Sequence, residues 1–140
     1  MYFSRRLFLA VPPAFAAFPV FAEEVGYLTV TDAHQKAKTG EIVLIDIRRP
    51  DEWQKTGIAE GAVPIDMRVS DLGARIDAAL KGNRDAPVAL ICHTGIRSSK
   101  LAEAMAKAGF SRVYDVGEGM GGSSDGPGWV KRGLPVERPQ

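Results

Sequence analysis

One cysteine and one arginine lie at the two ends of a short segment that could take part in a chemical reaction. Cys92 and Arg97 lie in Cys92-His93-Thr94-Gly95-Ile96-Arg97-Ser98, which follows the apolar run 87–91 and leads into a predicted helix. A loop that turns into a helix N-terminus directs several backbone N–H groups into one concavity, and such a site favours a thiolate. We predict that Cys92 is a catalytic nucleophile and that Arg97 completes the ring of donors around it. The residues expected to line the substrate loop are His93, Thr94, Gly95, Ile96 and Ser98.

A lone cysteine at the end of a core strand has a simpler interpretation, as a small buried hydrophobic residue. Two neighbours favour a reactive cysteine instead. Gly95 permits tight turning of the chain, and Arg97 would be costly to bury without an anion to meet.

Three further polar residues follow the apolar run 42–45. Asp46 and Arg48 leave the end of that run, where they could face the cysteine loop and set its shape. Glu52 lies four residues after Arg48, so we expect these two side chains to form an ion pair across a turn. We interpret all three as supporting residues rather than catalytic ones.

The remaining candidate residues have structural interpretations. His93 is expected to line the loop, and His34 to be solvated on the first predicted helix. Trp53 and Trp129 are expected to pack under the loops. The segment Gly117–Gly128 is a long glycine-rich connection, and connections of this kind often line the mouth of a binding pocket.

Strand and helix patterns alternate along the chain, and this alternation is typical of βαβ units with a parallel sheet. Apolar runs predict strands at 27–28, 42–45, 62–65, 87–91 and 113–116. Capped or amphipathic segments predict helices at 32–38, from Pro50 for a brief turn, at 71–81 and at 98–108. Thr31 is the expected cap of the first helix, and Gly40 its stop. The cysteine loop thus lies at the carboxyl end of a buried strand, where parallel sheets bind ligands.

The first 22 residues differ from the rest and predict a signal peptide. Arg5 and Arg6 precede an apolar run that is too short and too rich in proline to span a membrane, and a cut near Ala22 fits the small-residue rule. The paired arginines resemble a twin-arginine signal, with an ordinary Sec signal as the alternative. We therefore expect a periplasmic protein with no stable membrane anchor and a single domain over residues 23–140.

Composition excludes several classes of protein. The chain has 140 residues, of which 45% are hydrophobic and 25% charged, as in an ordinary globular protein. A single cysteine excludes an intramolecular disulfide, and no C-x-x-C or H-x-x-x-H spacing suggests zinc, so no metal site is expected. A net charge of +1 gives no basic field for nucleic acid.

The chain resembles the single-domain rhodaneses, a family of sulfurtransferases, in four motifs. They are Asp46-Ile47-Arg48 with Glu52-Trp53, Gly57-Ile58-Ala59-Glu60-Gly61-Ala62, Cys92–Ser98, and Gly109-Phe110 with Trp129 and Gly133-Leu134-Pro135-Val136. It departs from the family pattern twice: the usual histidine after Gly57 is absent, and the usual glycine pair is replaced by Gly117-Glu118-Gly119-Met120 with a longer insert.

This resemblance implies a five-stranded, mainly parallel α/β sheet with helices on both faces. It also implies that Cys92 carries sulfane sulfur as a persulfide, from a small anion such as thiosulfate to a thiol, a protein sulfur acceptor or cyanide, with no cofactor. Two alternatives stay open: a non-catalytic rhodanese-like binding module, and a phosphatase or arsenate reductase. Such phosphatase loops have five residues between cysteine and arginine, whereas this chain has four.

Overall fold

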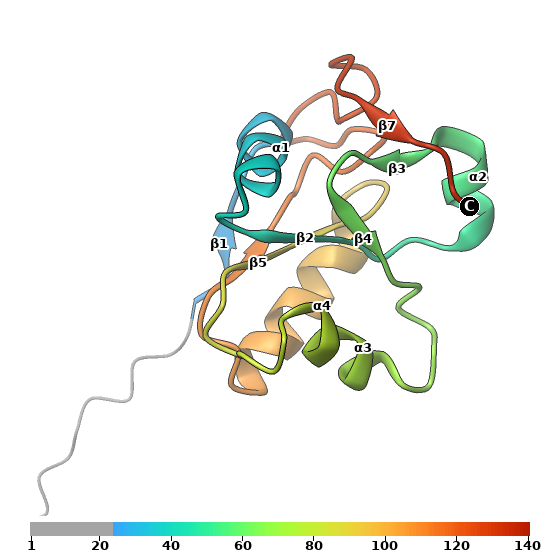
Figure 1. The fold of residues 1–140 in the computed structure, drawn as a ribbon. Coiled ribbons are helices and arrows are strands. Elements are labelled where there is room, and N and C mark those ends of the chain that lie inside the picture. Colours follow the sequence, from blue (N-terminus) through green and yellow to red (C-terminus); the bar gives the residue numbers. More distant parts are fainter. Residues whose placement is uncertain (1–23) are drawn as a thin grey trace, which may run out of the picture.

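A five-stranded sheet forms the centre of the computed structural model, which describes residues 24–140 (Figure 1). The strand order is β1-β6-β5-β2-β4, and every neighbouring pair is parallel. The strands are β1 (Gly26–Tyr27), β2 (Val43–Asp46), β4 (Ala62–Pro64), β5 (Val88–Ile91) and β6 (Val113–Asp115). The predicted α/β fold with a five-stranded parallel sheet is confirmed. The predicted signal peptide lies outside the described residues.

The two central strands are apolar throughout because both of their faces are buried. Along β5, Leu90 packs into the cluster that includes α3 and α4 residues, whereas Ala89 and Ile91 pack into the cluster that includes α1 residues. Figure 1 shows the same division, with α1 on one side of the sheet and α3 and α4 on the other. The core therefore has two layers, as the unbroken apolar runs predicted.

In the part of the chain that the structure describes, four helices connect the strands: α1 (Val30–Thr39), α2 (Pro50–Thr56), α3 (Leu72–Ala79) and α4 (Ile96–Lys107). The cap of α1 is Thr29, whose hydroxyl accepts a hydrogen bond from the amide of Asp32, so the prediction of Thr31 was wrong by two residues. Gly40 ends α1 in the left-handed conformation, as predicted. α4 begins before the predicted Ser98 because Gly95 takes a left-handed conformation and starts the helix there.

A short antiparallel ribbon lies beside α2, away from the main sheet (Figure 1). It pairs β3 (Ile58–Ala59) with β7 (Val136–Glu137). The sequence did not predict this ribbon, because its two strands lie far apart in the chain and no local pattern joins them. The ribbon fixes the segment that follows α2 against the end of the chain.

His34 is not solvated, contrary to the prediction. Its Nε2 lies 3.0 Å from Oε1 of Glu60, and its ring meets the indole of Trp129 edge-on at 5.2 Å. Trp129 is fully buried, as expected of a packing residue, and its Nε1 donates to the carbonyl of Pro135 at 2.9 Å. These contacts attach the segment after the glycine-rich loop to α1.

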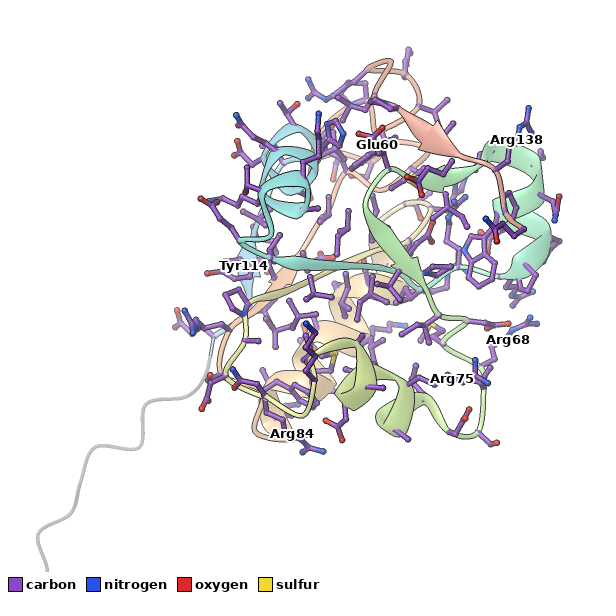
Figure 2. All side chains as sticks on the ribbon, viewed as in Figure 1. Glu60, Arg68, Arg75, Arg84, Tyr114 and Arg138 are labelled. Carbon is purple, nitrogen blue, oxygen red and sulfur yellow. The ribbon has the colours of Figure 1, made fainter. Side chains whose placement is uncertain are left out.

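The outer surface of the α3–α4 layer carries paired charges. Arg75 and Arg84 point outward there (Figure 2), and they form ion pairs with Asp71 and Asp77 at 2.9 and 3.1 Å. Local pairing neutralises these guanidinium charges. Within residues 24–140, no helix is long and apolar enough to cross a membrane.

Candidate active site

Cys92 follows β5 at the carboxyl edge of the sheet, and only 1% of its surface is exposed. Its Sγ accepts hydrogen bonds from the backbone N–H groups of Gly95, at 3.2 Å, and Ser98, at 3.4 Å. The thiol donates to Oγ of Ser98 at 3.3 Å, and that hydroxyl donates to the carbonyl of Gly95 at 3.2 Å. The sulfur is therefore surrounded by polar groups of its own loop rather than by hydrocarbon alone.

Gly95 gives the loop its curvature. Its φ of +85° lies in the left-handed region, and a Cβ atom there would collide with the carbonyl oxygen of Gly117. A glycine at this position thus allows both the turn and the close approach of the glycine-rich segment. The amide of Gly95 reaches the sulfur only because the chain turns at this point.

The start of the segment Gly117–Gly128 packs directly against the cysteine loop. The amide of Met120 donates to the carbonyl of Cys92, and the amide of Gly121 to the carbonyl of His93, both at 2.8 Å. A Cβ atom at Gly121 would collide with the His93 ring. Part of this segment therefore positions the loop, and another part, including Ser123 and Asp125, lines a cleft beside it, as the sequence suggested.

Arg97 does not donate to the sulfur. Its two terminal nitrogens bind both carboxylate oxygens of Glu52, at 2.8 and 2.6 Å. These hydrogen bonds are the largest cause that lowers the pKa of Glu52 from its ordinary 4.5 to about 2; burial opposes the shift, and the amide of Arg49 supports it. The predicted Arg48–Glu52 ion pair was wrong, because Arg97 approaches Glu52 from a distant part of the chain.

Arg48 instead forms a buried ion pair with Asp46, at 2.8 Å. Its remaining donors reach Oγ1 of Thr56 and the carbonyl of Gly57, each at 2.8 Å. Both members of the pair are fully buried, so their charges depend on these bonds. The pair joins the end of β2 to the end of α2, the helix that carries Glu52.

Two clefts flank the loop. The larger, of about 720 Å³, is bounded by Thr94, Gly95 and Ile96 on one side. The smaller, of about 280 Å³, includes His93, which is exposed as expected of a loop-lining residue. The structure thus brings the loop residues, Arg97 and Glu52 together. Asp46 and Arg48 support this group indirectly, because Arg48 binds the end of α2, the helix that carries Glu52.

Sequence reasoning missed Asp115 at this edge of the sheet. Asp115 ends β6, the neighbour of β5, and is 3% exposed. Burial raises the pKa of its carboxyl; the nearby Ser98 side chain opposes this, and the nearby Asp125 adds to it. The available signal was an aspartate near the end of a predicted strand, because the carboxyl ends of parallel strands meet at one edge of the sheet.

The fold and site define an α/β protein with a cysteine loop at the carboxyl edge of a parallel sheet. A match to the family described as "Rhodanese-like domain" covers residues 29–123, most of the chain. The protein belongs to the rhodanese-like domain family.

Two known proteins resemble this chain in sequence or in fold. The uncharacterized protein YibN of Escherichia coli K12 is 27% identical over 130 residues, which are 93% of this chain and 85% of YibN. The polysulfide-sulfur transferase homodimer of Wolinella succinogenes shares the fold, with a TM-score of 0.64, 24% identity, and coverage of 83% of this chain and 80% of that one.

A third similar protein carries a different suggested activity. A protein of unknown function from Rhodopseudomonas palustris CGA009, named a "possible tyrosine phosphatase", superposes with a TM-score of 0.59 and 25% identity, over 81% of this chain and 85% of that one. Membership of the rhodanese-like family supports sulfurtransferase-type activity in general.

Proposed function

We propose that the protein is a sulfurtransferase in which Cys92 carries sulfane sulfur as a persulfide. The observation that carries this proposal is the convergence of the Gly95 and Ser98 amides on Sγ of Cys92. Backbone N–H groups that are already in place stabilise negative charge on sulfur without reorganisation. The terminal sulfur of a persulfide is anionic, so the same loop suits both the free and the loaded states.

The reaction proceeds in two balanced displacements. The thiolate of Cys92 attacks the outer sulfur of thiosulfate, or of a similar donor. The S–S bond of the donor breaks, and sulfite leaves with the electron pair. A thiol or cyanide acceptor then attacks the outer sulfur of the persulfide, and the electron pair of the broken bond returns to Sγ.

Arg97 has a positioning role in this proposal, alongside any contact with the donor anion. It links the first turn of α4 to Glu52 of α2 and so fixes the helix end that directs the Ser98 amide at the sulfur. His93, Thr94 and Ile96 are exposed on the same loop, where a donor or acceptor would meet them. Asp46 and Arg48 hold α2 in place for this contact.

The test is thiosulfate-to-cyanide sulfur transfer by the wild-type protein and by Cys92→Ser. The variant should lose transfer while keeping the circular dichroism and urea midpoint of the wild type. Ser111→Ala, at the opposite edge of the sheet, is the matched control and should keep full activity. Continued turnover in Cys92→Ser would refute Cys92 as the sulfur carrier.

Mass spectrometry tests the carrier state directly. After incubation with thiosulfate, the peptide that contains Cys92 should gain about 32 Da, roughly one sulfur atom, as a persulfide requires. Cyanide should remove this added mass. A non-catalytic binding module would show no such gain.

A phosphatase is the second candidate, and the superposition on the Rhodopseudomonas protein favours testing it. The four residues between Cys92 and Arg97 make a shorter loop than that of such phosphatases, and Arg97 is held by Glu52 rather than directed at the sulfur. Hydrolysis of p-nitrophenyl phosphate, assayed beside sulfur transfer, separates the two activities. We propose sulfur transfer and expect no phosphate release above that of Cys92→Ser.

A further inference from the structure

The larger cleft beside the cysteine loop has an acidic character. Its lining combines the end of β1, the loop residues 94–96, the end of β6 and the glycine-rich segment. The charged side chains in this lining are Asp115, Glu118 and Asp125, and within residues 24–140 the cleft has no lysine or arginine in its lining. A volume of about 720 Å³ lies in the range of small-molecule sites.

The three carboxylates are not equivalent. Glu118 is satisfied by the guanidinium of Arg132, at 2.7 Å, and by the amide of Gly128, at 3.1 Å. Asp115 is almost fully buried, yet its Oδ1 has no hydrogen-bond partner in the described part of the chain. An unsatisfied buried acceptor costs free energy that a donor from a ligand would recover. Asp125 lies at the exposed side of the same cleft and adds a second negative charge.

Apolar surface completes the cleft. Tyr27 and Ile96, which are 74% and 63% exposed, are two of the largest apolar side chains that the protein leaves in water, and both line this cleft. Leu28 is a further apolar residue of the lining. A ligand with a short hydrocarbon body and a donor group at one end would match both parts of the surface.

Two residues connect the cleft to the sulfur. Gly95 lines the cleft, and its amide lies 3.2 Å from Sγ of Cys92. Asp115 lines the cleft next to Ser98, whose hydroxyl lies 3.3 Å from the same sulfur. A small molecule in the cleft would therefore contact Gly95, whose amide bonds the sulfur, whereas Cys92 itself is not among the lining residues.

We propose that this cleft binds the sulfur acceptor, and that the acceptor is a small thiol that carries an ammonium group, which Asp115 and Asp125 recognise. This inference rests on the proposed sulfur transfer and specifies its second displacement. The thiolate of the acceptor attacks the outer sulfur of the Cys92 persulfide, the S–S bond breaks, and its electron pair returns to Sγ. The acceptor leaves as its own persulfide, so sulfur and electrons balance.

A single-turnover experiment measures this preference. Protein loaded with sulfur from thiosulfate is mixed with cysteamine or with 2-mercaptoethanol, and loss of the persulfide is followed by mass. The ratio of the cysteamine rate to the 2-mercaptoethanol rate should fall about tenfold in Asp115→Asn/Asp125→Asn, since a charge-assisted hydrogen bond contributes enough for that change. Asp85→Asn, at the amino end of β5, is the matched control and should keep the wild-type ratio. An unchanged ratio in the double variant would overturn the inference.

A binding measurement separates this inference from the proposed function. S-methylcysteamine carries the ammonium group but has no free thiol, so it binds without accepting sulfur. Its titration should shift the amide NMR signals of Gly95, Gly117 and Asp125 in the wild type, and Asp125→Asn should weaken that binding. The single variant at exposed Asp125 keeps the test valid even if Asp115→Asn fails to fold.

The outcomes are distinguishable. Amine binding without any persulfide on Cys92 would refute the proposed function and support the assignment of the cleft as an amine-binding site. Sulfur transfer without amine binding would support the proposed function and overturn the cleft assignment.

Discussion

At the scale of single residues, Glu52 determines where the Arg97 guanidinium points. The two side chains are 45 residues apart in the chain, and they join α2 to the first turn of α4 through two hydrogen bonds. Both are partly buried, so solvent screens the pair less than it screens an exposed one. The pair orients the loop without placing a positive charge on the sulfur itself.

Glu52→Gln should therefore destabilise the protein by about 1–3 kcal/mol at pH 7, because it removes charge-assisted hydrogen bonds. The pKa of Glu52 is about 2 in the folded protein and ordinarily 4.5. A lowered folded-state pKa stabilises above pH 4.5, and this contribution is lost as the pH falls toward 2. Urea unfolding at pH 7 and pH 3 should show a smaller difference between variant and wild type at pH 3. Asp51→Asn, in the same helical turn, is the control; a difference independent of pH would contradict this origin.

Arg48→Met should lower the free energy of unfolding by about 3–5 kcal/mol, which is more than Glu52→Gln, because it leaves Asp46 buried and unpaired. Arg75→Met removes an exposed ion pair with Asp71 and should cost less than about 1 kcal/mol. Urea denaturation of both variants would measure these losses. Adding Asp46→Asn to Arg48→Met should recover part of the loss, and no recovery would show that packing rather than charge explains it.

At the scale of elements, the shape of the cysteine loop depends on a second segment that packs against it. The glycine-rich segment donates two backbone hydrogen bonds to the loop and approaches Gly95 closely through Gly117. Strand β5 and helix α4 provide the ends of the loop, and this contact supports its middle. The loop is thus a tertiary structure rather than a local turn.

Gly95→Ala tests that dependence. The substitution places a Cβ atom against the Gly117 carbonyl in addition to the strain of a left-handed alanine, which is about 1–2 kcal/mol. Gly82→Ala is a matched control, since Gly82 has a φ of +75° but no atom within 4 Å of its added Cβ. Urea denaturation should show a larger loss for Gly95→Ala, and sulfur transfer should fall only in that variant. Equal losses would mean that the Gly117 contact does not matter.

The elements also show what the sequence could predict. The strands β2 and β5, the start of α2 at Pro50 and the stop of α1 at Gly40 carry local signals, and each was predicted to within one or two residues. The Arg97–Glu52 and His34–Glu60 pairs carry none, because the partners are far apart in the chain. Arg48 has a nearer acidic neighbour in Asp46, which took the place expected for Glu52. Sequence spacing identified the residues of the site, but not which of them bind one another.

At the scale of the whole molecule, the parallel sheet gathers the site at one edge. β2, β5 and β6 end there, and they bring Asp46, Cys92 and Asp115 from three separate parts of the chain to that edge. Strand order was not predictable from local patterns, since β1 pairs with β6 and β2 pairs with β5, and these partners lie far apart in the sequence. The acidic cleft depends on that order, because β6 lies next to β5.

The predicted export of the molecule is a separate test at this scale. We expect expression in a bacterial host to yield periplasmic protein whose mass corresponds to cleavage near Ala22. Arg5→Lys/Arg6→Lys should block export by a twin-arginine route, whereas a Sec signal tolerates lysines. Processing that continues in the double variant would support the Sec alternative, and a full-length mass in the cytoplasm would contradict the signal peptide.

The depth of Cys92 has one more consequence. A disulfide bond requires two sulfur atoms about 2 Å apart, and the chain has no second cysteine. With 1% of the residue exposed, two folded copies cannot bring their sulfurs that close. Folded copies of the protein therefore cannot cross-link to one another through Cys92, even at high concentration.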